Sequence, residues 1–280
     1  SPVRVAVVRF RDILNTLRLA YWMRNDVETP VGILGIGTYF PSQIETAADL
    51  VERTGIPEAV LRDKMGIRQR HVAGEDDSIS VMASNAAQRA IEHASISPED
   101  INVVVSHGSE YKDHVVWNAA GKIQHNVGAV NAYAFEMYVL CAGAPITINA
   151  VKSMMQADPS LRYGLLAAAS RENDLINYQN QRSRFMFNFG AGAGALVLAR
   201  GLNRNVILGA SAFTDGSLSE TVMLTTDMIG DGPDVLGDVR GRLDVRNAEY
   251  MGERLGQTSL PNFVRVIREE DEKSGASLAD

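Results

Sequence analysis

This sequence of 280 residues has very little cysteine and no excess of positive charge. Its one cysteine, Cys141, can form neither an internal disulfide nor a metal site built from several cysteines, and such sparse cysteine indicates a reducing compartment such as the cytoplasm. Lys and Arg number 27 against 34 Asp and Glu, which gives a net charge of −7. We therefore expect no binding to nucleic acid.

Long apolar runs are absent as well. No stretch approaches the roughly 20 consecutive apolar residues of a membrane span, so we predict none. The first 24 residues differ from the remainder, since they hold five arginines against one aspartate. We interpret residues 1–30 as an N-terminal extension, with a targeting peptide or a docking helix as the alternatives. The folded body is expected to begin near Val31.

Short apolar runs alternate with helical patterns from there on, which is typical of α/β proteins. Strands are expected at 31–37, 101–107, 132–140, 163–170, 194–199 and 205–213. Helices are expected at 45–54, 57–64, 79–94, 117–127 and 145–157. These patterns predict a mostly parallel sheet at least six strands wide. The segment that starts at residue 205 weakly repeats the one that starts at residue 31, which indicates two similar halves.

Cys141 lies between an apolar run and a helical pattern, in the segment VLCAGAP. Pro145 is tolerated only in the first turn of a helix, so this helix should begin within about four residues of the cysteine. Its free N–H groups and the positive end of its dipole would favour the nucleophilic thiolate and could hold an oxyanion. The alternative is a small buried hydrophobic residue at a strand end.

The glycine run and the histidines carry weaker signals. The run FNFGAGAGALVLA at 187–199 precedes a strand, whereas a dinucleotide-binding loop follows one, so we expect close backbone packing there. The five histidines have no metal-binding spacing, so no metal site is expected. His107 and His114 could face a cleft, although surface or buried structural roles are the alternative.

Basic residues gather at two places in an otherwise acidic chain. Lys64 and Arg68 belong to the segment KMGIRQRH, and Arg182 and Arg184 precede the glycine run. Either group could bind a phosphate-bearing ligand, or could simply be solvated at the surface.

Four motifs occur in an order that points to one family: GILGIGTYFP, MGIRQRH, LCAG and FNFGAGAGALVLA. Over residues 31–280 the sequence resembles the 3-oxoacyl-acyl-carrier-protein synthase III group of the thiolase superfamily. The resemblance implies a layered αβαβα fold of two similar halves, here 31–204 and an incomplete 205–280. It also implies a homodimer, no cofactor, and acyl-CoA and malonyl-acyl-carrier-protein as substrates.

The resemblance further assigns roles to residues. Cys141 matches the acylated nucleophile, and its backbone N–H would belong to the oxyanion hole. Four basic residues are assigned to CoA: Lys64, Arg68, Arg182 and Arg184. The chain departs from the family at Val60, which stands where some relatives have a tryptophan, and at Ser183, whose position is basic in relatives. Ala191 and Glu136 each replace an aspartate, which leaves the acyl substrate open.

The resemblance also implies a histidine and an asparagine from the second half, which stabilise the enolate formed on decarboxylation. Their motifs would follow residue 280, so we expect this chain to be acylated at Cys141 without completing condensation. Two alternatives stay open. One is a condensing enzyme of the hydroxymethylglutaryl-CoA synthase type, for which Glu110 is the candidate glutamate; the other is a non-catalytic fragment that binds a partner or a ligand.

Overall fold

The structure is a computed structural model that describes residues 29–225 and 241–275. Of the expected extension at 1–30, only the last two residues are described. Residues 276–280 also lie outside the described residues. The expected start of the fold near Val31 agrees with the first strand, which begins at that residue.

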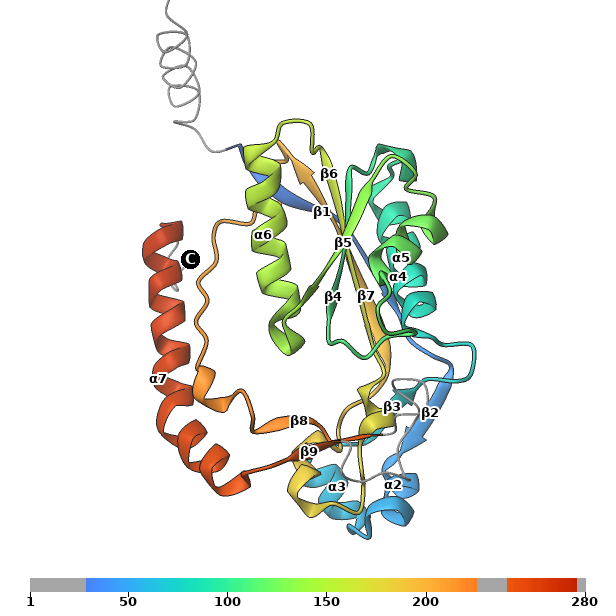
Figure 1. Ribbon diagram of the computed structural model, residues 1–280, viewed down its shortest axis with the longest axis vertical. Coiled ribbons are helices and arrows are strands. Elements are labelled where there is room, and N and C mark those ends of the chain that lie inside the picture. The colour runs from blue at the N-terminus through green and yellow to red at the C-terminus, as the bar shows by residue number, and fades with distance from the viewer. Residues whose placement is uncertain (1–28, 226–240, 276–280) are drawn as a thin grey trace, which may run out of the picture.

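A five-stranded mixed sheet, in the order β1-β7-β6-β4-β5, forms the centre of the fold (Figure 1). Its strands are β1 (Val31–Tyr39), β4 (Val103–Gly108), β5 (Tyr133–Tyr138), β6 (Tyr163–Ser170) and β7 (Gly192–Arg200). Strand β4 runs parallel to both of its neighbours, and β7 runs antiparallel to both of its neighbours. The expected α/β class is confirmed, but the prediction of six or more mostly parallel strands is wrong.

The missing strand is the apolar run at 205–213, which forms only one isolated bridge, between Val206 and Gly32. Ile33 N–H donates to the carbonyl of Asn205, and Ile207 N–H donates to that of Val31. After these contacts the run leaves the edge of β1. An apolar run becomes a strand only where a neighbouring strand pairs with it, and here that pairing ends after two hydrogen bonds.

Helices cover both faces of the sheet (Figure 1). Helices α4 (Ile79–Ala94) and α5 (Ala119–Val127) pack on one face, and α6 (Gly143–Ala157) packs on the other. Strand β1 approaches α4 through its glycines: a Cβ atom on Gly37 would lie 2.1 Å from the carbonyl oxygen of Ala86. In the glycine run, where the sequence predicts close backbone packing, a Cβ atom on Gly190 would lie 3.1 Å from the carbonyl oxygen of His71, whereas Gly194 has open space around it.

A second unit lies beyond one end of the sheet (Figure 1). It contains β2 (Gln43–Thr46), α2 (Ala47–Thr54), α3 (Glu58–Asp63), β3 (Gln69–Val72), β8 (Val222–Thr225) and β9 (Arg242–Val245). Short 3₁₀ helices are η1 (Pro98–Asp100), η2 (Leu140–Ala142), η3 (Glu172–Leu175), η4 (Gln181–Met186) and η5 (Gly216–Leu218). The apolar interior of the unit that contains α2 and α3 is called the second core. It comprises Ala47, Leu50, Ile56, Leu61, Ile67, Ile176, Tyr178, Met186, Phe187 and Val245.

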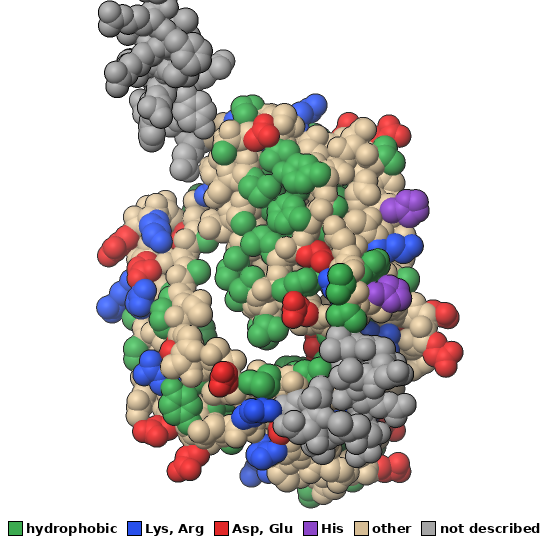
Figure 2. Space-filling view, viewed as in Figure 1, with side chains coloured by type: hydrophobic (Ala, Val, Ile, Leu, Met, Phe, Trp, Pro, Cys, Tyr) green, Lys and Arg blue, Asp and Glu red, His purple; other side chains and the backbone are tan. Residues whose placement is uncertain are grey.

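Helix α7 (Ala248–Ser274) stands apart from the central sheet. It contacts the segment after β7 through Ser211, which donates to Glu269 at 2.6 Å, and through an ion pair of 2.8 Å between Arg254 and Asp215. Figure 2 shows apolar side chains over the α6 side of the sheet and a hollow between that surface and α7. In the described part of the chain, no helix is long and apolar enough to cross a membrane.

Candidate functional site

Cys141 lies at the edge of the sheet where the parallel strands β4 and β5 both end. Strand β5 ends at Tyr138, η2 carries Cys141, and α6 begins at Gly143. The predicted helix start is therefore confirmed. Cys141 is exposed, so the alternative of a small buried hydrophobic residue is wrong. In Figure 1 the start of α6 points toward the unit that contains α2 and α3.

A tight turn presents Cys141 to solvent. Leu140, the residue before it, has a φ of 50°, in the left-handed region that a residue with a side chain rarely adopts. The turn is fixed by two hydrogen bonds: Val139 N–H donates to the carbonyl of Gly108 at 3.2 Å, and Ala142 N–H donates to that of Val139 at 3.1 Å. Strain of about 1–3 kcal/mol at such a residue persists only where the surroundings hold it.

Glu136 holds the loop beside this turn. Its carboxylate accepts from Ala119 N–H at 2.8 Å, pairs with Lys112 Nζ at 2.9 Å, and accepts from the Tyr138 hydroxyl. It thereby joins β5, the loop after β4 and the start of α5. Burial, followed by the hydrogen bond to Glu136, raises the pKa of Tyr138, which therefore stays a hydrogen-bond donor. The sequence marked Glu136 only as a departure from aspartate, because its partners are distant along the chain.

The other candidates from this loop have different surroundings. Glu110 is exposed, and its charge contributes to the raised pKa of Tyr138, so it lies near the same edge. His114 is exposed and makes an edge-on ring contact with Trp117. His107 is half-buried and faces α6. Among the described residues, no group of three or more His, Cys, Asp or Glu side chains could hold a metal ion.

The four basic residues assigned to CoA lie on the second unit, not beside Cys141. Lys64 and Arg68 are exposed at the end of α3 and just after it. Arg184 is exposed in η4, whereas Arg182 forms an ion pair of 2.7 Å with Asp244. The second core packs α3, η4 and β9 together, so segments far apart in sequence carry these side chains on one body.

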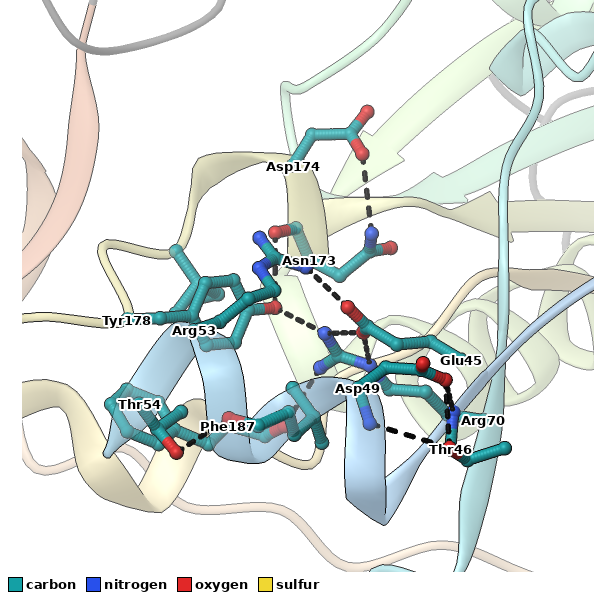
Figure 3. Close-up of polar contacts among 12 residues, drawn as sticks. Glu45, Thr46, Asp49, Arg53, Thr54, Arg70, Asn173, Asp174, Tyr178 and Phe187 are labelled. Carbon is teal, nitrogen blue, oxygen red and sulfur yellow. Dashed lines mark hydrogen bonds and ion pairs between the residues drawn. The ribbon is translucent and has the colours of Figure 1, made fainter. Parts of the chain in front are cut away.

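A buried arginine connects this unit to the glycine run (Figure 3). The Arg70 side chain is 5% exposed and pairs with Glu45, with Nε to Oε2 at 2.7 Å. It also donates to the carbonyls of Phe187 and Phe189, at 2.7 and 2.6 Å, and to the Tyr178 hydroxyl at 2.6 Å. Arg70 thus fixes β3 against the chain that leads into β7.

Sequence reasoning missed Arg53 and Arg242. Arg53 pairs with Glu45 and lies over the ring of Tyr178, with its Cζ 3.9 Å from the ring centre. Both arginines line an open pocket of about 250 Å³ together with Ile176, Asn177, Tyr178 and Gln179. No sequence signal connects α2 with β9, since only the folded second core brings these segments together.

Similar proteins point to one family. The family model for 3-oxoacyl-[acyl-carrier-protein] synthase III matches residues 135–216, which include Cys141 and the glycine run. The β-ketoacyl-[acyl-carrier-protein] synthase III of Paramagnetospirillum magneticum is 28% identical over 188 residues, covering 66% of this chain and 57% of the relative. That of Wolbachia pipientis is 26% identical over 186 residues, covering 66% and 58%. The chain thus spans less than two thirds of these relatives.

Solved structures share the fold. The priming β-ketosynthase of the R1128 polyketide pathway matches with a TM-score of 0.74 at 24% identity, covering 90% of this chain and 72% of that one. The 3-oxoacyl-[acyl-carrier-protein] synthase III of Aquifex aeolicus matches with a TM-score of 0.72 at 24% identity, covering 88% and 73%. Xanthomonas campestris OleA, solved with lauric acid and lauroyl-CoA, matches with a TM-score of 0.67 at 19% identity, covering 90% and 76%. By the family model, the curated relatives and the shared α/β fold, this chain is similar to the 3-oxoacyl-[acyl-carrier-protein] synthase III family.

Proposed function

We propose that this chain takes an acyl group from acyl-CoA onto Cys141. The observation that carries the proposal is the exposed cysteine on a tight turn, two residues before a helix start, within the segment that matches the family model. The thiolate attacks the thioester carbonyl and CoA leaves as its thiolate, which takes up the proton. The N–H groups at the start of α6 are suited to hold the oxyanion.

In the complete reaction, the acyl-enzyme would condense with malonyl-acyl-carrier-protein, with loss of carbon dioxide and return of the free thiol. The chain spans 57% of the first relative. For this polypeptide we therefore propose the acyl-transfer half. We also propose that it acts in the cytoplasm, where acyl-CoA and a carrier protein would meet it, and that it needs no cofactor.

We propose two structural features along with this activity. Residues 31–204 form the half that carries the nucleophile, and residues 205–280 begin a second, similar half. The assembly is a homodimer in which the edge strand β5 is covered, since β5 has an unpaired side in the described residues and Tyr133 on it is 49% exposed. Sedimentation velocity at several protein concentrations tests the dimer.

Release of CoA tests the acyl transfer. Acyl-CoA thioesters of increasing chain length are mixed with the protein, and CoA is quantified by chromatography. We expect a burst of about one CoA per chain, because the chain has one cysteine. Protein blocked beforehand with iodoacetamide is the control, since alkylation consumes that thiol. No burst with any thioester, or an equal burst from blocked protein, contradicts the proposal.

If Lys64 and Arg68 bind CoA, removing their charges should raise the acyl-CoA concentration that the burst of CoA release requires. Replacing both Lys64 and Arg68 by alanine should raise the acyl-CoA concentration for half-maximal burst rate by roughly threefold to tenfold, because exposed charges contribute about 0.2–1 kcal/mol each. The effect should shrink at high salt. Arg62→Ala is the matched control, since Arg62 is an exposed arginine on the preceding helix α3 and pairs with Glu58. An equal shift in the control contradicts the assignment.

The hydroxymethylglutaryl-CoA synthase type remains a second candidate, favoured by Glu110 near the edge that carries Cys141. In that case Glu110→Gln should keep the CoA burst and abolish condensation of the acyl-enzyme with a second thioester. If no condensation with a second acyl-CoA occurs in the unchanged protein, this candidate is wrong.

A further inference from the structure

The interface between α6 and β4 changes character along its length. Val103 and Val105 of β4 face α6, and α6 faces back with Val151 and Met155, all within one apolar cluster. Alternation along a strand places His107 on the same face as Val103 and Val105. On α6, Gly143 and Thr147 precede Val151 at intervals of four residues and so share its face. The interface is therefore apolar at one end and polar at the end next to Cys141.

His107 fits against the first residue of α6. A Cβ atom on Gly143 would lie 3.1 Å from Nδ1 of His107 and 3.1 Å from the backbone nitrogen of Gly108. The imidazole thus lies against the space that the missing side chain of Gly143 leaves. Since Gly143 is two residues after Cys141, this contact lies next to the turn that carries the thiol.

The polar end of this interface has a cost in stability. The hydroxyl oxygen of Thr147 is fully buried and has no hydrogen-bond partner among the described residues. Burial also lowers the pKa of His107 below its ordinary value of 6.5. Apolar side chains at both positions would avoid these penalties. Departures of this kind concentrate at functional sites.

The surroundings of His107 leave it uncharged at neutral pH. Met137 faces it from β5, where the two residues are register partners, and Gly143 faces it from α6. Neither residue is titratable, and β6 is lined by alanines at this level. Glu136 and Tyr138 project to the opposite face of the sheet, because side chains alternate along β5. Other titratable groups at this edge are Cys141 itself, the exposed Glu110, Tyr111 and Lys112 in the loop after β4, and Glu172 after β6, which accepts from the Ser109 hydroxyl.

We propose that His107 is a positioning residue for Cys141: its ring packs against Gly143 and holds the first turn of α6, so that the thiol stays exposed beside the N–H groups of the helix start. This role of His107 would serve the proposed acyl transfer, and in that sense the inference rests on the proposed function. The experiment that tests it does not depend on acyl transfer. It concerns the reactivity of the thiol, which can be measured without any acyl-CoA.

The test compares His107→Ala, His107→Gln and the unchanged protein. His125→Gln is the matched control, because His125 is an exposed histidine on α5. The first readout is the rate at which iodoacetamide alkylates Cys141, and the second is the CoA burst. We expect His107→Ala to slow alkylation roughly tenfold to a hundredfold, since a displacement of about 1 Å can cost that much. His107→Gln fills the space with an uncharged side chain, so its rate at pH 7.5 should stay within about threefold of the unchanged protein.

The pH profile separates positioning from a loss of folding. Protonated imidazole next to the positive end of α6 is unfavourable, so the ratio of alkylation rates, unchanged protein over His107→Gln, should be constant above pH 6.5 and fall below it. Circular dichroism at each pH shows whether the chains are folded. If His107→Ala does not fold, folded His107→Gln decides the matter: an alkylation rate at pH 7.5 that differs from that of the unchanged protein by more than about threefold overturns the proposal.

The two readouts distinguish this inference from the proposed function. If His107→Ala slows alkylation but no protein releases CoA, His107 is a positioning residue and the acyl transfer is wrong. If the unchanged protein and folded His107→Ala show equal alkylation and equal bursts, the acyl transfer stands and the inference is overturned. If His125→Gln slows alkylation as much as His107→Ala does, the effect is not specific and the inference is likewise overturned.

Discussion

Replacing Cys141 by serine should abolish the burst of CoA release, with a rate reduced on the order of 10³-fold or more. A serine hydroxyl stays protonated at neutral pH and needs a base to become a nucleophile, whereas a thiol ionises readily. Cys141 is exposed, so the substitution leaves the packing of the turn intact. The change in unfolding free energy should stay within about 0.5 kcal/mol.

The measurement is quenched-flow release of CoA from the preferred thioester, with urea unfolding of the same samples. Cys141→Ala is the matched control, because it also lacks the thiol but adds no hydroxyl at this position. It should be as inactive as Cys141→Ser. A burst of unchanged size and rate in folded Cys141→Ser would show that another residue accepts the acyl group.

Replacing Arg70 by methionine should lower the free energy of unfolding by about 3–5 kcal/mol, the usual cost of removing one partner of a buried ion pair. The guanidinium contacts the Glu45 carboxylate, the Tyr178 hydroxyl and the carbonyls of Phe187 and Phe189 (Figure 3). Methionine fills the volume but leaves these polar atoms without their donor. The loss should also loosen the glycine run before β7.

Arg53→Met is the matched control for this prediction, because Arg53 pairs with the same Glu45 carboxylate but is 45% exposed. We expect it to cost about 1 kcal/mol or less. The measurement is urea unfolding of both variants, followed by fluorescence. Equal midpoints for Arg70→Met and Arg53→Met would show that the buried network does not stabilise the fold.

Local patterns in the sequence predicted the elements around the site well. The expected helix at 79–94 has the observed bounds of α4, because Ser78 caps it and small residues form its buried face. The expected strand at 163–170 likewise has the bounds of β6. The start of α6 followed from Pro145, which needs the first turn of a helix. These features depend on neighbouring residues alone.

Features that depend on distant segments were not predicted. The antiparallel direction of β7 against β1 and β6 has no local signal, because long connections separate these strands. The apolar run at 205–213 has strand composition but leaves β1 after Ile207. Arg70, Glu45 and Tyr178 meet only once the second core has formed, and the contact of His107 with Gly143 needs the packing of α6 on β4.

The central claim is that Cys141 accepts an acyl group, and the mass of the intact protein after exposure to acyl-CoA tests it most directly. Unchanged protein and Cys141→Ser are incubated with the same thioesters and weighed side by side. We expect a mass increase of one acyl group, carried by the peptide that contains Cys141 and absent from the serine variant. If folded protein gains no mass with any thioester, or if both chains gain it equally, Cys141 is not the acyl acceptor.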